Sequence, residues 1–251
     1  MAPSQHHRPP HRDPIARADE TYWVESRQPL ASLVFIAPWL VVYEAGMFLP
    51  VTIAVRNGAD AWLRQFLAWV GFGQYFLLPI LTVCILLGWH YTTRKPWRFS
   101  RGLLWNMAGE CALLAVCLRL LLFLQHHLWH PLAGSPRLNI AETLGATVSY
   151  LGAGIYEELL FRLILLSLAI WMLRRLKVEP RPSVVIGVLL TSLMFATAHH
   201  IGPHGDPFGS FVFLFRCLAG VFFSILFLCR GFGIAAGAHA VYDILVGLFQ
   251  W

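Results

Sequence analysis

The chain has 251 residues, of which 57% are hydrophobic and 13% are charged, and its mean hydropathy is +0.61. Soluble globular domains carry about a quarter charged residues, so this composition excludes an ordinary soluble domain and indicates that lipid surrounds much of the chain. Open sheets are excluded as well, because lipid offers backbone N–H and C=O groups no hydrogen-bond partner. The predicted fold class is therefore all-α, a polytopic membrane helix bundle with about seven or eight transmembrane helices.

The first 28 residues are rich in proline, histidine and arginine. We predict that residues 1–28 form a disordered cytoplasmic tail and that residues 29–251 form the transmembrane domain. Within that domain, a short amphipathic helix is predicted at 59–67, and 126–144 is predicted to hold a short interfacial helix or an eighth span. Seven apolar runs, each near the ~20 residues that cross a bilayer, predict transmembrane helices at 30–51, 68–90, 102–125, 145–173, 183–199, 209–229 and 232–250.

Lysine and arginine are distributed unevenly among the segments outside these runs. The N-terminal tail and the second, fourth and sixth loops hold thirteen of them, whereas the alternate loops hold three. Because basic residues are retained on the cytoplasmic side, we expect the N-terminus to be cytoplasmic and the C-terminus to lie outside. This topology also accounts for the net charge of +6, so no nucleic-acid partner is expected.

One group of charged residues lies inside the fourth predicted span, where each charge costs about 2.5–3.5 kcal/mol on insertion scales. Glu158 and Arg162 are four residues apart and share a helix face, so they can pair. Glu157 is rotated by about 100° from Glu158, so Arg162 cannot serve both carboxylates equally. Glu157 is therefore a candidate general base for water. The alternative is a structural ion pair that locks two helices together.

Histidines in two later spans extend this pattern. His199 ends the fifth predicted span, a place where a histidine is also common simply as an interfacial residue. His239 and Asp243 lie four residues apart in the seventh span, so Asp243 can accept a hydrogen bond from the imidazole. The alternative for this pair is a buried contact that fixes helix packing.

Glutamate, histidine and aspartate side chains from three late helices can converge inside a bundle. They would supply a general base, a group that holds the water and a donor for a developing oxyanion. Glu157, His199 and His239 also resemble the ligands of a zinc hydrolase. The sequence has no HExxH segment, and no carboxylate–histidine pair has a familiar zinc spacing. No cofactor is therefore favoured, and zinc bound by these three residues is the alternative.

Three motifs taken together, EExxxR at 157–162, FxxxH at 195–199 and HxxxD at 239–243, resemble the CPBP intramembrane protease family. This family includes type II CAAX prenyl endopeptidases and bacteriocin-processing or immunity proteins, and it has been described both as metal-dependent and as metal-free with a catalytic glutamate. The resemblance extends over residues 145–247. It implies an intramembrane endopeptidase that cuts a membrane-associated protein and resides in the bacterial inner (plasma) membrane.

The resemblance also implies a role for each site residue. Glu157 is expected to activate water, His199 to position or polarise it, and His239 with Asp243 to stabilise the oxyanion, while Glu158 and Arg162 support them. Prenyl-processing members have asparagine at the position of Asp243, and an ionised aspartate cannot donate a hydrogen bond. We therefore expect Asp243 to orient His239, which then donates alone.

The depth of these residues in the membrane bears on the substrate. Glu157 lies 17 residues before Arg174, about 25 Å along a helix that ends inside, and His199 ends a span that begins inside. His239 is nine residues past Arg230, about 13 Å along its helix and near mid-depth. We expect the site to open toward the outer face and to cut a membrane-anchored protein or peptide near its transmembrane segment. A cytoplasmic prenylated substrate fits less well.

Two other classes of function stay open from the sequence. An ion- or proton-coupled transporter would use the intramembrane charges as a conduction path. A non-catalytic membrane scaffold or immunity protein would keep the motifs for packing. A transporter predicts inverted repeats and broken helices, and the sequence displays neither clearly.

Overall fold

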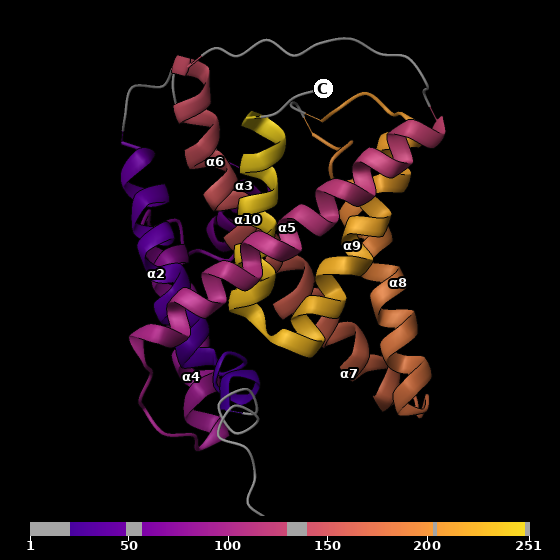
Figure 1. Cartoon of the computed structure of the whole chain (residues 1–251). Helices are drawn as coiled ribbons and strands as arrows, with labels where there is room; N and C mark the ends of the chain where they lie inside the picture. The colour runs from indigo at the N-terminus through magenta and orange to yellow at the C-terminus, as the bar shows by residue number, and fades with distance from the viewer. Residues whose placement is uncertain (1–20, 49–56, 130–139, 203–204, 249–251) are drawn as a thin grey trace, which may run out of the picture.

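The protein is a bundle of helices (Figure 1). The computed structural model describes residues 21–48, 57–129, 140–202 and 205–248, and every regular element among them is helical, as predicted. One helical turn at 21–25 precedes the bundle. The helices are α2 (Pro29–Gly46), α3 (Gly58–Trp69), α4 (Leu77–Thr93), α5 (Arg101–Trp129), α6 (Ile140–Glu158), the π-helix η1 (Leu159–Leu166), α7 (Ser167–Arg175), α8 (Pro180–Ala198), α9 (Ser210–Arg230) and α10 (Phe232–Leu248).

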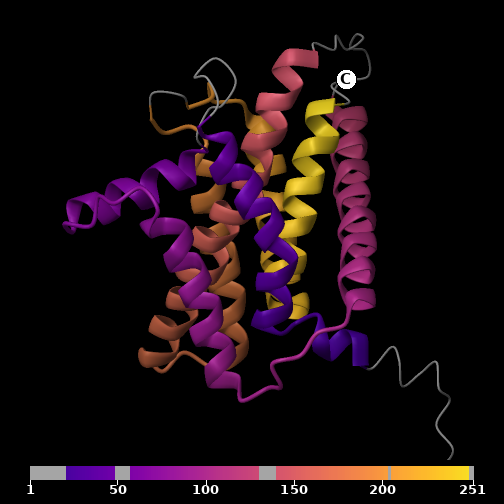
Figure 2. The same cartoon turned by 90° about the vertical axis from the view of Figure 1, so that its left-hand side faces the viewer.

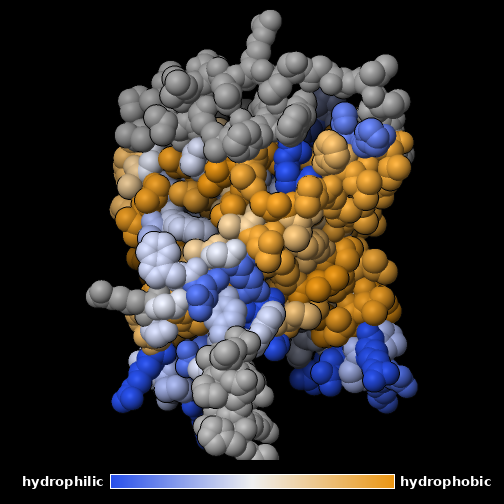
Figure 3. Space-filling model, viewed as in Figure 1, coloured by the Kyte–Doolittle hydropathy of each residue, from blue (hydrophilic) through white to orange (hydrophobic). Residues whose placement is uncertain are grey.

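Four helices are long and apolar enough to cross a membrane: Pro29–Gly46, Gly102–Leu128, Pro180–Ala198 and Ser210–Arg230. Two shorter apolar helices, Leu77–Thr93 and Phe232–Gly247, accompany them. In Figure 3 apolar side chains cover the middle of the visible face, and hydrophilic residues gather at the lower end. The chain is therefore an integral membrane protein with a polytopic helical bundle, as the composition predicted.

Some boundaries differ from the predicted ones. The second predicted span, placed at 68–90, begins only at Leu77, because the chain turns at Gly71, whose φ is +99°. The amphipathic helix predicted at 59–67 is present as α3, which projects sideways from the bundle (Figure 2). Residues 1–20 of the tail predicted at 1–28, the end of the first predicted span and residues 130–139 of the segment 126–144 lie outside the described residues. Residues 21–25 of that tail are helical and Ser26 is buried, so this part of the tail is ordered against the bundle.

The fourth predicted span, at 145–173, consists of three consecutive segments: α6, η1 and α7. The eight residues of η1 form a π-helix immediately after Glu158, where the sequence predicted a regular α-helix. Short π segments within α-helices occur frequently at functional sites. The segment LLFRLILL contains neither glycine nor proline, so no local signal pointed to it.

Close packing of α6 against α10 brings the predicted site residues together. α10 runs through the bundle with α6, α5, α9 and α2 packed against it (Figure 1). At Gly154 a Cβ atom would lie 2.6 Å from the carbonyl oxygen of Ala236 and 2.7 Å from the Cβ of Ala240. Only glycine permits this approach. It sets the turn of α6 that carries Glu157 and Glu158 against α10.

Candidate active site

Three predicted residues, Glu157, His199 and His239, converge within the bundle. Glu157 lies near the end of α6, His199 directly follows α8, and His239 lies on α10. One oxygen of Glu157, Oε2, is 3.8 Å from Nε2 of His199 and also 3.8 Å from Nε2 of His239. Both separations exceed hydrogen-bond length. Among the described residues, this buried oxygen has no hydrogen-bond donor.

The surroundings of His199 define which of its nitrogens carries the hydrogen. Nδ1 lies 2.8 Å from the carbonyl oxygen of Phe195. A carbonyl oxygen only accepts, so Nδ1–H donates and the neutral ring keeps a lone pair on Nε2, the nitrogen that faces Glu157. The imidazole also packs edge-on against the Phe195 ring, with centroids 4.8 Å apart. His199 is thus oriented to present an acceptor toward the carboxylate.

His239 is held from three directions. Its Nδ1 is 2.7 Å from Oε1 of Glu158, and its Nε2 is 3.5 Å from Oδ2 of Asp243. The ring of Phe223 stacks on the imidazole at 4.4 Å. The sequence predicted a hydrogen bond between His239 and Asp243, but the hydrogen-bonding contact is to Glu158 on the facing helix. Asp243 approaches the other nitrogen at ion-pair distance.

Glu158 and Arg162 form the pair that their spacing predicted. Arg162 Nη1 lies 3.0 Å from Glu158 Oε1, and both side chains are almost fully buried. The guanidinium lies 4.4 Å from the Phe195 ring centroid, a distance typical of a cation–π contact. Because the same Glu158 oxygen meets Arg162 and His239, the pair links η1 to α10.

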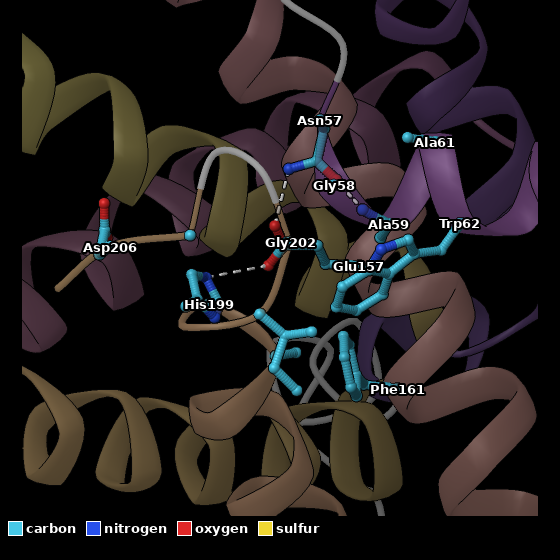
Figure 4. A pocket seen from close by; sticks show the side chains of 13 residues that line it. Asn57, Gly58, Ala59, Ala61, Trp62, Glu157, Phe161, His199, Gly202 and Asp206 are labelled. Atoms are coloured by element: carbon cyan, nitrogen blue, oxygen red, sulfur yellow. Dashed lines mark hydrogen bonds and ion pairs between the residues drawn. The ribbon is translucent and has the colours of Figure 1, made fainter. Parts of the chain in front are cut away.

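Sequence reasoning missed Asn57, the residue that contacts the second oxygen of Glu157. Its Nδ2 donates to Glu157 Oε1 at 2.7 Å, while its Oδ1 accepts from the backbone N–H of Ala59 at 2.8 Å (Figure 4). The second bond is an N-cap of α3, which an asparagine before a short helix indicates. The first bond spans 100 residues, and no local pattern predicts it.

Two cavities meet at Glu157 and His199. The first has a volume of about 320 Å³ and is lined by residues of α3 and of the α8–α9 connection, including Asn57, Trp62 and Asp206 (Figure 4). The second, of about 300 Å³, is lined by apolar side chains of α9 together with polar residues that include His239 and Asp243. A chain crossing from one cavity to the other would pass the Glu157 carboxylate.

Arg216 on α9 also lines the second cavity. It donates to Oδ2 of Asp206 in the α8–α9 connection, and this hydrogen bond lowers the pKa of the Asp206 carboxyl below its usual value. The pair joins the wall of the second cavity to the rim of the first.

A metal site requires several ligand side chains gathered around one point. Among residues 21–48, 57–129, 140–202 and 205–248, no group of three or more His, Cys, Asp or Glu side chains has positions that could hold a metal ion. Glu157, His199 and His239, the zinc ligands considered from the sequence, form no such group among the described residues.

The model of the type II CAAX prenyl endopeptidase Rce1-like family matches residues 139–245. The family resemblance seen in the sequence is thereby confirmed. The matched segment runs from α6 to α10 and contains every site residue that the sequence predicted, whereas Asn57 and α3 precede it. No curated protein and no solved structure matches the chain.

The matched family model is that of a prenyl endopeptidase, which is a peptidase. It supports a peptidase activity for the chain and a peptide or protein as its substrate, in the setting of a membrane.

Proposed function

We propose that the protein is an intramembrane endopeptidase that hydrolyses a peptide bond of a membrane-anchored protein or peptide, with Glu157 as the base that activates water. One observation carries the proposal. Oε2 of Glu157 is buried, has no donor among the described residues and faces two imidazole nitrogens at equal distances of 3.8 Å. The Rce1-like match supports hydrolysis over the transporter and scaffold alternatives.

The nucleophile in this proposal is a water molecule held between Glu157 and His199. The water donates one hydrogen to the carboxylate and the other to the lone pair on His199 Nε2, which the Phe195 carbonyl keeps available. Its oxygen attacks the peptide carbonyl as Glu157 takes a proton. Glu157 then gives that proton to the departing amine, which leaves the carboxylate ready for another cycle.

The oxyanion of the tetrahedral intermediate is assigned to His239. To donate there, Nε2 must carry a hydrogen while Nδ1–H donates to Glu158 at 2.7 Å. This is the imidazolium form, which the nearby carboxylates of Glu158 and Asp243 stabilise by charge. When a donor of this kind, positioned where negative charge develops, is removed from an enzyme, kcat typically falls roughly 10²–10³-fold.

The substrate is proposed to enter from the end of the bundle that carries the α8–α9 connection. The first cavity is lined there by Ile201, Gly202 and Gly205, at the opposite end of α8 from Pro180. With a cytoplasmic N-terminus and the basic loops inside, as proposed from the charge distribution, this end faces outward in the bacterial inner membrane. The proposed catalysis has no step through a metal, and it assigns no cofactor.

The first prediction concerns Glu157→Gln, which is nearly isosteric but cannot accept a proton from water. We expect the loss of at least about 10²-fold in cleavage rate, with folding unchanged. Quantitative proteomics of membrane fractions from cells with wild-type or variant protein should reveal a membrane-anchored protein that stays uncleaved in the variant. Glu179→Gln, an exposed carboxylate before α8, is the matched control and should cleave normally.

The same experiment separates the alternatives. A scaffold keeps its cellular function in Glu157→Gln cells, and a transporter loses function without any change in the size of membrane proteins. If the wild-type protein, purified and folded, leaves every membrane protein found by the proteomics uncut, the endopeptidase proposal is wrong.

A further inference from the structure

We infer that Asn57 is a positioning residue for Glu157, supplied by the N-terminus of α3 from outside the segment that matches the Rce1-like family. The inference rests on the proposed role of Glu157 as the base. Asn57 is half-buried, and its Nδ2 donates to Glu157 Oε1 at 2.7 Å. This hydrogen bond points Oε2, the other oxygen, toward His199 (Figure 4). Oε2 also lies 3.8 Å from Nε2 of His239.

The amide of Asn57 suits this position because its oxygen and its NH₂ group bind different partners. Its oxygen accepts from Ala59 N–H and caps α3, which leaves the NH₂ group for the carboxylate. Because the oxygen is bound to Ala59 in this cap, the NH₂ group is the part of the amide that faces Glu157. A carboxylate that accepts such a bond loses rotational freedom, so its free oxygen stays in one place for water.

The position of Asn57 is in turn held by a buried polar network that anchors α3 to the bundle. Arg64, about two turns further along α3, contacts Asp60 at 2.5 Å and Glu44 of α2 at 2.8 Å. Asp60 also accepts from the Tyr43 hydroxyl at 2.9 Å, and the same hydroxyl lies 3.4 Å from the backbone N of Asn57. The amphipathic helix therefore docks in one register, with its first residues at the site.

The network reaches α6 by a second route. The hydroxyl of Tyr156, the residue before Glu157, donates to Glu44 Oε1 at 2.5 Å. Both the backbone that carries Glu157 and the helix that carries Asn57 are thus tied to the same carboxylate on α2. This shared anchor explains how a residue 100 positions away in sequence keeps hydrogen-bond contact with the proposed base.

Glu157 also has charged and titratable neighbours that are the same in the variants compared below. On or directly after α6, η1, α8, α9 and α10 they are His199, His239, Glu158, Arg162, Asp243 and Arg216, and the nearest on α2 and α3 are Glu44, Asp60 and Arg64. Substitutions at position 57 leave all of them in place. A change in the titration of Glu157 in such variants therefore reports the contact with Asn57.

Two substitutions of Asn57 test the inference. Asn57→Asp keeps the size of the side chain and the helix cap but places a second carboxylate against Glu157, and two adjacent carboxylates resist joint ionisation. Asn57→Ser keeps a cap but is too short to reach Glu157. Asn106→Ser, at an exposed position on α5, is the matched control.

For cleavage of the substrate found by the proteomics, Asn57→Ser should lower kcat about tenfold or more with little change in KM. Asn57→Asp should move the acid limb of the pH profile of kcat/KM upward by about one unit or more. Asn106→Ser should do neither. A purely structural loss of the cap lowers the amount of folded protein and leaves the pH profile of the remainder in place.

A second measurement does not need turnover. The infrared carboxyl band of Glu157 is assigned by subtracting spectra of Glu157→Gln from those of the wild type. In each Asn57 variant the band is assigned in the same way, by subtracting spectra of the double variant that also carries Glu157→Gln, and its intensity is then followed against pH. A band that titrates at higher pH in Asn57→Asp supports the inference even if the protein proves not to be a peptidase. A band that titrates at the wild-type pH in both Asn57 variants overturns it, and Asn57→Ser decides alone if Asn57→Asp does not fold.

Discussion

At the scale of single residues, the site depends on how one carboxylate and two imidazoles are oriented. His199 is set by a backbone carbonyl four residues earlier, at 2.8 Å. His239 is set by Glu158 across the α6–α10 contact, at 2.7 Å. Asp243, which the sequence suggested as the residue that orients His239, lies 3.5 Å from Nε2, on the same side as Glu157.

Asp243 therefore acts in our proposal on the nitrogen that donates to the oxyanion. We expect Asp243→Asn to keep activity within about tenfold, because the amide offers an oxygen of the same size and can also donate. Asp243→Ala removes the neighbouring carboxylate and should lose about a hundredfold. The measurement is kcat/KM for the substrate identified by proteomics. Equal losses in the two variants would contradict this role.

At the scale of elements, the site depends on a close approach of two helices and on a π segment. Gly154 lets α6 contact the backbone of α10, which places Glu158 beside His239. Directly after Glu158, the chain enters η1, where Arg162 lies buried against the same carboxylate. The close contact with α10 at Gly154 and the start of the π segment after Glu158 thus lie within about one turn of each other on α6.

Gly154→Ala tests this contact. Alanine usually stabilises a helix relative to glycine by roughly 0.5–1 kcal/mol, but at this position its Cβ would lie 2.6 Å from a backbone oxygen. We therefore expect a lower melting temperature in detergent, consistent with an overpacking cost of about 1–3 kcal/mol, and a cleavage rate reduced by more than about tenfold.

Gly109→Ala on α5 is the matched control, because a Cβ there meets nothing within 4 Å. It should keep activity and melt no earlier than the wild type. If both alanine variants are equally stable and active, the close approach of α6 and α10 does not constrain the site.

At the scale of the whole molecule, the basic residues at the ends of α4, α7 and α9 lie at the opposite end of the bundle from the site opening. Arg94 follows α4, Arg175 ends α7 and Arg230 ends α9, and hydrophilic residues cluster at that lower end in Figure 3. The first cavity opens near Ile201, beyond the far end of α8. Positive residues are retained in the cytoplasm, so the opening is proposed to face outward.

Cysteine accessibility tests this orientation. In a chain whose five native cysteines are replaced, a cysteine at the exposed position 201 should react with a membrane-impermeant maleimide added outside intact spheroplasts. A cysteine in place of Arg175 should react only after the membrane is opened. Labelling of position 201 solely from the cytoplasmic side would overturn the outward opening and would favour a cytoplasmic substrate.

Much of the fold followed from the sequence alone. Long apolar runs must become helices in lipid, because backbone groups there have no other partners, and four long apolar helices lie where such runs were recognised. Within one helix the four-residue spacing determines which side chains share a face. For that reason, the contact between Glu158 and Arg162 could be predicted and is present at 3.0 Å.

Only the tertiary structure decided the contacts between helices. Glu158 bonds to His239, and Asn57 bonds to Glu157, across 81 and 100 residues of sequence. The carboxylates and histidines of the candidate site therefore form one connected group only when α3, α6, α8 and α10 pack together. Periodicity along a helix says which residues share a face, but it carries no information on which face meets another, since that depends on close approach and on the fit of side chains.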